Sequence, residues 1–460
     1  MCLISFTSLP GQKVLSLEES IKIALDKSLL LQQSNNSIKL AEISETEAKH
    51  NQYPNVSGNS GLNFNFGRSV DPTSNQFVNE TFITNNYAVN SGILLFNGFR
   101  LKNILKQSKI DRAAAKADYL QDEADIALQV ASIYLNGLFA KENISFSNNQ
   151  LTQIQDQLSN INKLINAGVR PKNESLEIEA QIASGEQNLL AAENALISAK
   201  LQLKQLLRLD PKQDIDLTVP AEPEDLKDVD LITFDLAYEE ALEYQPSIRA
   251  AKLRENSASI GIEIAESAFY PSLTLGGSLN TAYSNKGVNI LPGNLVRSAQ
   301  PAYINGELVI LGFDQPGIES ASWGSQVRDN LSFGFGLNLN VPIYNNQSGK
   351  LNKQRSELNL ISSQIATEQI KQSVQTLVLQ ALTDAKNAKK ALAASEKTKE
   401  ARDAAWENAK KQYNAGALNS FDLSNVQSQY ELASINYLQE KYNYIFRVII
   451  LDYYMGKPVK

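Results

Sequence analysis

Cysteine and histidine are almost absent from this 460-residue sequence, which contains one of each, Cys2 and His50. A single cysteine cannot form a disulfide within the chain, and a single histidine leaves no Cys/His cluster of the kind that binds zinc. The sequence also lacks a glycine-rich loop followed by lysine between a strand and a helix, the motif that holds nucleotide phosphates. We therefore predict no catalytic, cofactor-binding or metal site, and we expect a protein that is not an enzyme.

Long hydrophobic runs are missing as well. The best apolar helical candidate, residues 126–140, is interrupted by Gln129, Ser132 and Asn136. A spanning helix needs about 20 consecutive, predominantly apolar residues. Any membrane crossing by this chain must therefore use strands.

An excess of positive charge is also lacking. The formal net charge is −7, and the Lys and Arg residues are scattered along predicted helices instead of forming a stripe. Nucleic acid is therefore not an expected partner. Hydrophobic residues make up 43% of the chain and charged residues 20%, which excludes both a disordered chain and a helical membrane protein.

The first residues, 1–12, contain a short apolar piece, Cys2 to Phe6, followed by Pro10 and Gly11. Three interpretations stay open. The segment is the remnant of a signal peptide that lacks its basic start, or Cys2 carries a lipid anchor, or the terminus is disordered. No small-residue motif for lipid attachment precedes Cys2.

The sequence repeats itself. The Tyr-Pro pairs at 53–54 and 270–271 lie 217 positions apart, and the Ala-Gly pairs at 167–168 and 415–416 lie 248 positions apart. Self-similarity of this kind indicates two copies of one unit. Because the separation grows by 31 between the two anchors, the second copy carries about 31 extra residues in one connection.

Each copy is predicted to run helix, strand, strand, long helix, shorter helix. The helices are predicted over 17–52, 101–166 and 174–207 in the first copy, and over 234–269, 350–414 and 421–453 in the second. At about 1.5 Å per residue the long helices measure on the order of 100 Å, more than a compact core requires, and their composition is typical of coiled coils. A polar linker at 210–232 divides the chain into repeats 13–209 and 233–460.

Four segments alternate strictly between apolar and polar residues. They are predicted as strands over about 54–66, 86–96, 271–284 and 330–343. In the last of them, Phe333, Phe335 and Leu337 alternate with Gly334 and Gly336. This period of two places one face in apolar surroundings and the other in water, and runs of this length can cross a bilayer when tilted.

A soluble sheet covered on one side by helices would alternate in the same way. The Gly, Asn and Ser residues of the polar face suit a water-filled lumen, and aromatic residues stand at the strand ends, so the membrane interpretation is favoured. Four strands cannot close a barrel, and an open sheet edge in lipid is very unfavourable. We therefore expect protomers to share strands, and a wet inner face favours a trimer of twelve strands over a dimer of eight. The connections 71–84 and 285–330 are predicted as loops on the outer side.

Two other classes of protein compete with this interpretation. A coiled-coil filament would explain the long helices, but it gives no purpose to the four strands or the repeat. A soluble helical scaffold or adaptor would explain the helical hairpins, and cell fractionation separates it from an outer-membrane trimer.

The same order of elements occurs twice, with Tyr-Pro before the first strand of each copy and Ala-Gly at each helical turn. In this respect the chain resembles the TolC-like outer-membrane efflux proteins over about residues 13–458. The resemblance implies a mainly α fold with a membrane β part: a trimeric twelve-stranded β-barrel in the outer membrane, continued by an α-helical coiled-coil barrel in the periplasm. It implies a homotrimer surrounded by outer-membrane lipid, which works with a periplasmic adaptor (membrane fusion) protein and an inner-membrane pump in efflux or type I secretion. The transported substrate is not indicated.

The resemblance also implies a gate at the periplasmic tip. Aligned on the turn glycines, the family's gate tyrosine falls on Tyr413 and its first aperture aspartate on Asp422. The second aperture aspartate is replaced by Asn425, the latch arginine by Leu418, and the first-half Thr-Asp pair by Asn173 and Glu174. These departures weaken the expectation of a ring of charged residues at the aperture.

A second interpretation of Tyr413 and Asp422 is a helix-end aromatic and a first-turn carboxylate that the helix dipole favours. The two tight turns are expected to contact the adaptor by resemblance, although a tight turn favours small residues in any case. The turn candidates are Ala167, Gly168, Val169, Ala415, Gly416 and Ala417.

Overall fold

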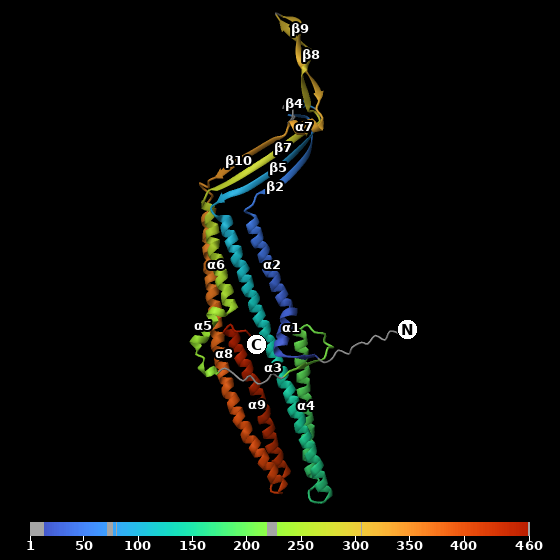
Figure 1. Cartoon of the computed structure of the whole chain (residues 1–460), viewed down its shortest axis with the longest axis vertical. Helices are drawn as coiled ribbons and strands as arrows, with labels where there is room; N and C mark the ends of the chain where they lie inside the picture. Colours follow the sequence, from blue (N-terminus) through green and yellow to red (C-terminus); the bar gives the residue numbers. More distant parts are fainter. Residues whose placement is uncertain (1–12, 71–76, 80, 219–227, 305, 459–460) are drawn as a thin grey trace, which may run out of the picture. The chain divides into compact units, whose positions relative to one another are not determined.

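The computed structural model describes residues 13–70, 77–79, 81–218, 228–304 and 306–458 (Figure 1). The predicted signal remnant at 1–12, with Cys2, lies outside the described residues. The chain forms two compact units. Unit 1 comprises Met1–Glu42, Lys109–Ala258 and Asn359–Lys460, and unit 2 comprises Ile43–Ser108 and Ser259–Leu358.

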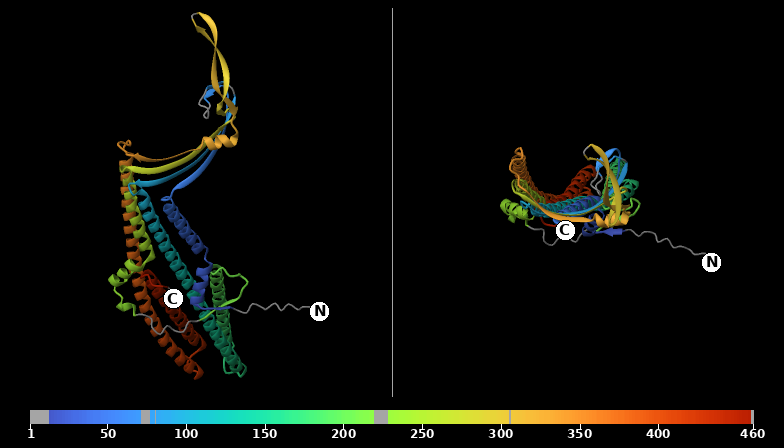
Figure 2. Two further views of the ribbon diagram at one scale, coloured as in Figure 1. Left: turned by 45° about the horizontal axis from the view of Figure 1, so that its top comes forward. Right: turned by 90° about the horizontal axis from the view of Figure 1, so that it is seen from above.

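Unit 2 contains a four-stranded antiparallel sheet in the order β10-β7-β5-β2 (Figure 1). Its strands are β2 (Asn55–Asn65), β5 (Phe82–Asn97), β7 (Ser272–Ser284) and β10 (Ser332–Asn340). The pairing of β5 with β7 places strands from the two halves of the sequence side by side. All four strands bend along their length (Figure 2).

Two strand ends differ from the sequence prediction. β5 begins at Phe82, earlier than the predicted residue 86, because Phe82 is 1% exposed and pairs with Asn65 at the end of β2. β10 ends at Asn340, before the predicted residue 343, because Pro342 has no N–H to donate to a ladder.

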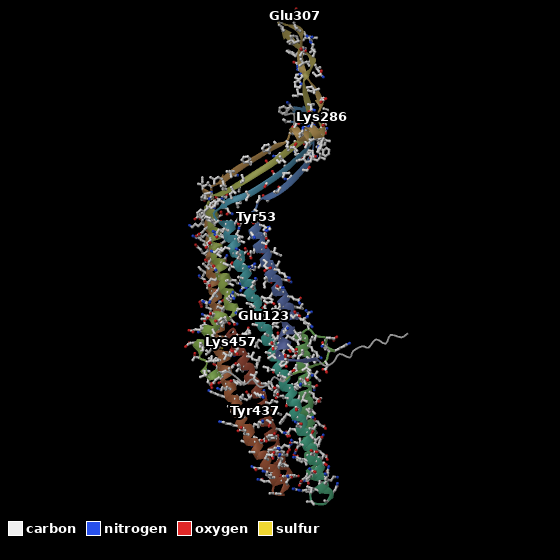
Figure 3. All side chains as sticks on the ribbon, viewed as in Figure 1. Tyr53, Glu123, Lys286, Glu307, Tyr437 and Lys457 are labelled. Atoms are coloured by element: carbon white, nitrogen blue, oxygen red, sulfur yellow. The ribbon has the colours of Figure 1, made fainter. Side chains whose placement is uncertain are left out.

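The predicted loop at 285–330 is wrong. β8 (Val288–Ile304) and β9 (Glu307–Ser320) form a two-stranded antiparallel ribbon, and α7 (Trp323–Asp329) follows it. In Figure 3, Lys286 labels the base of this ribbon, and Glu307, the first residue of β9, labels its far end. The prolines at 292, 301 and 316 obscured the strand pattern, since proline occurs in strands chiefly at edges, and each strand of a ribbon has a free edge.

Part of the other predicted loop, 71–84, is also extended. β3 (Arg68–Val70) pairs with β4 (Phe77–Asn79), and residues 71–76 between them lie outside the described residues.

The long helices are the main feature of both halves. α3 (Arg100–Asn166) and α8 (Ser348–Asn414) have 67 residues each, and each is followed by a return helix, α4 (Asn173–Leu206) or α9 (Ser420–Tyr454). These bounds agree with the predicted ones to within two residues, because the apolar periodicity continues to each helix end. Among the described residues, none of the helices combines the length and apolar character that a membrane-spanning helix requires.

The first helix of each half is broken, although the sequence pattern predicts one continuous helix. α1 (Leu17–Lys27) and α2 (Leu29–His50) are separated by Ser28, which is extended and whose Oγ accepts a hydrogen bond from the N–H of Leu31 at 3.3 Å. α5 (Phe234–Tyr244) and α6 (Pro246–Glu266) are separated by Gln245, which precedes a proline and is therefore disfavoured in helical conformation. Residues 267–269 form a 3₁₀ turn.

Unit 1 contains a short parallel sheet. β1 (Lys13–Leu15) pairs with β6 (Ile215–Leu217), so the predicted polar linker contributes a strand. Leu15 and Ile215 are fully buried. The hydroxyl of the buried Tyr134 lies 2.8 Å from the carbonyl oxygen of Leu15 and 2.7 Å from that of Thr218, and so connects α3 to both chain segments. A three-residue strand is too short to show alternation in the sequence.

A second core packs α5, α6, α8 and α9 together. Ala241, Ile248, Val378 and Ala385 are fully buried there. The many alanines allow these helices to approach closely, as expected for a coiled-coil seam.

Candidate functional site

The four-stranded sheet of unit 2 has one apolar face. The strand register forms this face from rows of apolar residues. One row aligns Leu337 of β10 with Leu275 of β7 and Ile93 of β5, and another aligns Phe333, Leu279 and Val89. Phe335 lies on the same face of β10, between Phe333 and Leu337. On β10 this face is very exposed: Phe333 is 83% exposed and Phe335 87%. Exposed contiguous apolar surface of this kind requires an apolar environment or a partner.

The opposite face of the same sheet is polar and carries small side chains. Its residues alternate with the apolar ones along every strand. They include Asn55, Ser57, Asn59, Ala88, Asn90, Thr274, Ser278, Asn280, Ser332, Gly334, Gly336 and Asn338. The sheet can therefore separate an apolar medium from water. Its edge strands are β10 and β2.

Two tight turns join the long helices of unit 1 to their return helices, and they lie at the same end of that unit (Figure 1). Gly168 has φ +72° and Gly416 has φ +75°. In the first turn the N–H of Gly168 donates to the carbonyl of Ile165 and the N–H of Val169 to that of Leu164, at 2.9 Å each, and the second turn repeats this pattern. Both are Schellman motifs, in which glycine is favoured because of its left-handed backbone.

Three side chains meet between these two helical hairpins, and we call them the tip cluster: Arg170, Glu174 and Tyr413. The Tyr413 hydroxyl donates to Glu174 Oε2 at 3.5 Å. Arg170 Nη1 lies 3.4 Å from Glu174 Oε1, and the Arg170 guanidinium carbon stands 5.1 Å from the centre of the Tyr413 ring. The second hairpin thus contributes one aromatic side chain to a charged pair on the first.

Tyr413 also packs against apolar residues of both hairpins. It contacts the cluster formed by Ile154, Ile161 and Ile178, and the cluster around Trp406 and Leu423. Burial, with the nearby Glu174 carboxylate, raises the pKa of Tyr413, so the phenol stays protonated and can donate at neutral pH. Beside it lies a cavity of about 220 Å³ bounded by α3, α4, α8 and α9, the tip cavity.

The structure brings together only part of the predicted gate. Tyr413 and Glu174 are in contact, whereas Asp422 is exposed and bonded within its own helix start, where its N–H and Oδ2 meet the side chain of Asn419 at 2.8 and 2.9 Å. Asn173 and Asn425 are exposed, at the start of α4 and in the second turn of α9. The six turn candidates are also exposed: Ala167, Gly168, Val169, Ala415, Gly416 and Ala417.

Arg170 was not among the predicted gate residues. The alignment puts Leu418 at the position of the family's latch arginine, and Leu418 packs with Trp406, Ala409 and Leu423. The sequence signal for Arg170 was its place four residues before Glu174. Oppositely charged side chains at this spacing can form an ion pair where a helix begins.

The fold resembles that of solved outer-membrane proteins. It superposes on the outer membrane protein VceC of Vibrio cholerae with a TM-score of 0.73 and 13% identity, covering 96% of this chain and 97% of that one. It also superposes on the open state of the MtrE outer membrane channel of Neisseria gonorrhoeae, with a TM-score of 0.70 and 18% identity over 96% of this chain and 89% of that one. The resemblance predicted from the sequence is thereby confirmed at the level of the fold.

Sequence comparison assigns the family. Residues 20–207 and 237–457 match the model of the family described as "Outer membrane efflux protein", and the chain belongs to that family. A curated relative, the outer membrane efflux protein BepC of Brucella suis biovar 1 (strain 1330), is 21% identical over 294 residues. This match covers 64% of the present chain and 61% of BepC.

Proposed function

We propose that the chain is the outer-membrane channel subunit of a tripartite efflux or type I secretion system. Three copies form a twelve-stranded β-barrel in the outer membrane, and their long helices form a tunnel through the periplasm. The channel is passive and conducts substrates that a periplasmic adaptor and an inner-membrane pump deliver. The transport energy comes from the pump.

The two-faced sheet carries this proposal. Its apolar face includes Phe333 and Phe335, which are more than four-fifths exposed in the single chain. Lipid is the medium that such a face fits, while the Gly, Ser and Asn residues behind it suit water. A sheet edge cannot remain unpaired in lipid, so β10 of one protomer must pair with β2 of the next.

The polar face of the sheet supports the proposed number of protomers. Two copies would give eight strands, whose interior is filled by side chains, and three give twelve, which leaves an aqueous bore. Small residues on the polar face favour the wider assembly. The order of elements supports repeats 13–209 and 233–460 joined by segment 210–232, since each contains a 67-residue helix and its return helix.

The tip cluster is the proposed periplasmic gate. Tyr413 connects one helical hairpin to Glu174 and Arg170 of the other, so separating the hairpins must break these contacts. The solved MtrE channel, described as open, supports the idea that channels of this fold change state. The exposed turns around Gly168 and Gly416 are the proposed contacts of the adaptor.

A cysteine cross-link tests the assembly. In a Cys2→Ser background, Ser57→Cys on β2 is combined in turn with Gly334→Cys, Gly336→Cys or Asn338→Cys on β10, all on the polar face. We expect one combination to give a covalent trimer after oxidation. A ladder that stops at the dimer would contradict the twelve-stranded barrel, and no cross-link in any combination would contradict shared edges.

Single-channel recording tests the gate. Tyr413→Ala with Glu174→Ala should raise the conductance of the purified protein in a planar bilayer, because it removes the contact between hairpins. Tyr437→Ala is the matched control, since the Tyr437 ring contacts Lys399 of its own hairpin at 4.7 Å (Figure 3). Equal conductance of both variants would remove the gate assignment and leave the channel assignment intact.

A further inference from the structure

A second cavity lies between α3, α4 and α9 in unit 1, and its volume is about 160 Å³. It shares Gln181, Ser424 and Gln427 with the tip cavity, so the two spaces adjoin along α9. We call it the inter-hairpin cavity because its walls come from both helical hairpins. A single water needs roughly 10–15 Å³ by the same kind of measure, so this space can hold more than one small group.

Two residues that line this cavity, Gln150 and Gln427, each carry a buried amide oxygen without a hydrogen-bond partner among the described residues. Gln427 is 2% exposed and Gln150 8% exposed, and the Oε1 atom of each has no hydrogen bond within the described part of the chain. The Gln427 amide is oriented by its other end, because Nε2 donates to Glu431 Oε1 at 2.9 Å. A buried acceptor without a partner is unfavourable, so these two oxygens favour a ligand that brings hydrogen-bond donors.

The cavity is lined by an acidic side chain. Among the described residues that line it, Glu431 is the one ionisable group, and neither Lys nor Arg joins it there. Burial raises the pKa of Glu431, which means that the ionised carboxylate lacks stabilisation from water. A cation would provide that stabilisation.

The remaining wall distinguishes between kinds of cation. Phe146, Ile154 and Ile435 line the apolar side. Within the described residues no group of three or more His, Cys, Asp or Glu side chains is placed to hold a metal ion. One carboxylate, two amide oxygens and an apolar wall fit a cation that has both N–H donors and a hydrocarbon part.

We propose that the inter-hairpin cavity binds a small organic ammonium ion. Its nitrogen donates to Gln150 Oε1, Gln427 Oε1 and the Glu431 carboxylate, and its hydrocarbon part packs against Ile154 and Phe146. Because Gln150 belongs to α3 and the other two groups to α9, the ligand connects the two hairpins. The further consequence, that it lowers the open probability of the channel, rests on the proposed function, whereas the binding itself does not.

Isothermal titration of the purified full-length protein in detergent tests the binding, with n-butylammonium chloride as the probe. We expect saturable binding at one site per chain. Neutral n-butanol and equimolar sodium chloride should not compete, because they lack the N–H donors or the hydrocarbon part. Glu431→Gln should weaken the affinity by about 10- to 100-fold, the usual effect of losing a charged hydrogen-bond partner.

The matched control is Glu440→Gln, which removes a carboxylate from the same helix outside the cavity lining. Two further variants keep the proposal testable if Glu431→Gln fails to fold. Gln427→Leu removes an acceptor at similar volume, and Ser184→Trp fills the exposed rim; both should abolish binding.

Three results would overturn the proposal. They are equal affinity of n-butylammonium for Glu431→Gln and wild type, competition by n-butanol as strong as that by n-butylammonium itself, and a high-resolution structure determined with n-butylammonium in which the cavity holds water only. Recording conductance with and without the probe then tests the consequence separately. Binding without any channel activity would contradict the proposed function and leave the proposed site intact. Channel activity without binding would contradict the proposed site and leave the proposed function intact.

Discussion

Leu337→Arg is the substitution that most directly tests the apolar face of the sheet. Leu337 lies near the middle of β10, is 66% exposed in the single chain, and is paired with Leu275 of β7. In the proposed barrel it faces the bilayer near the midplane. An arginine at that depth on the lipid side costs about 2–4 kcal/mol, and three copies raise this to roughly 6–12 kcal/mol per trimer if the sites act independently. That is comparable with the whole stability of a folded domain, about 5–15 kcal/mol.

The assay compares Leu337→Arg with Asn338→Arg. Asn338 is the next residue on β10, it is also exposed, and it lies on the polar face. The contact described for Asn338 uses its backbone carbonyl, which accepts from Thr274 Oγ1 at 3.4 Å, so the side chain can be replaced without losing it. Outer-membrane fractions are solubilised, and the amount of trimer is measured by light scattering after gel filtration. We expect trimer from Asn338→Arg in wild-type amount and almost none from Leu337→Arg.

A water-soluble scaffold would behave in the opposite way, because an exposed Leu→Arg change on such a protein is neutral or improves solubility. Normal trimer yield from Leu337→Arg would therefore refute the assignment of this face to lipid. Loss of trimer in both variants would show that any arginine on β10 disturbs folding, and the inference from the two faces would fail.

Three further outcomes follow from the structure. Gly416→Ala should destabilise the protein by about 1–2 kcal/mol in thermal melts, because Gly416 has a φ of +75°. The control Gly185→Ala, within α4, should not destabilise it, since the added Cβ makes an ordinary contact at 3.4 Å with Leu151. Tyr134→Phe should cost about 1–3 kcal/mol, because it removes the buried hydroxyl that bonds to the carbonyl oxygens of Leu15 and Thr218. Because the pKa of Glu431 is raised in the folded state, this group stabilises the fold fully below its ordinary pKa of 4.5 and loses that contribution as pH rises through the folded-state pKa. Between acid and neutral pH the melting temperature should therefore fall more in wild type than in Glu431→Gln. Equal pH profiles of the two proteins would refute this.

The long helices and four sheet strands were predictable because their patterns repeat over many residues. Apolar spacing across 67 residues indicates a helix whatever surrounds it. The breaks at Ser28 and Gln245 were missed, because one non-helical residue leaves the flanking periodicity intact. β6 was missed because its strand character depends on burial against Tyr134, which no local pattern reveals.

The ribbon of β8 and β9 shows a different limit. Its residues alternate, but Pro301 and Pro316 would be excluded from an interior strand, and the sequence alone does not reveal that both strands are edges. In the tip cluster, the contact of Tyr413 with Glu174 was anticipated through the family resemblance. The role of Arg170 was not, because it depends on how the Schellman turn directs that side chain.

The placement of the arginine bears on how firmly the proposed gate can close. With Leu418 in an apolar cluster and Arg170 on the first hairpin, the charged pair of Arg170 and Glu174 is complete without the second hairpin. Beyond the packing of Tyr413 against apolar residues of both hairpins, closure gains a cation–π contact of about 0.5–1 kcal/mol at a partly exposed site and a hydrogen bond that is long at 3.5 Å. These two polar contacts sum to about 1–2 kcal/mol for each protomer, which is within the range that binding of a partner at the exposed turns can supply. An adaptor that opens the proposed gate therefore has to overcome these contacts together with the apolar packing of Tyr413.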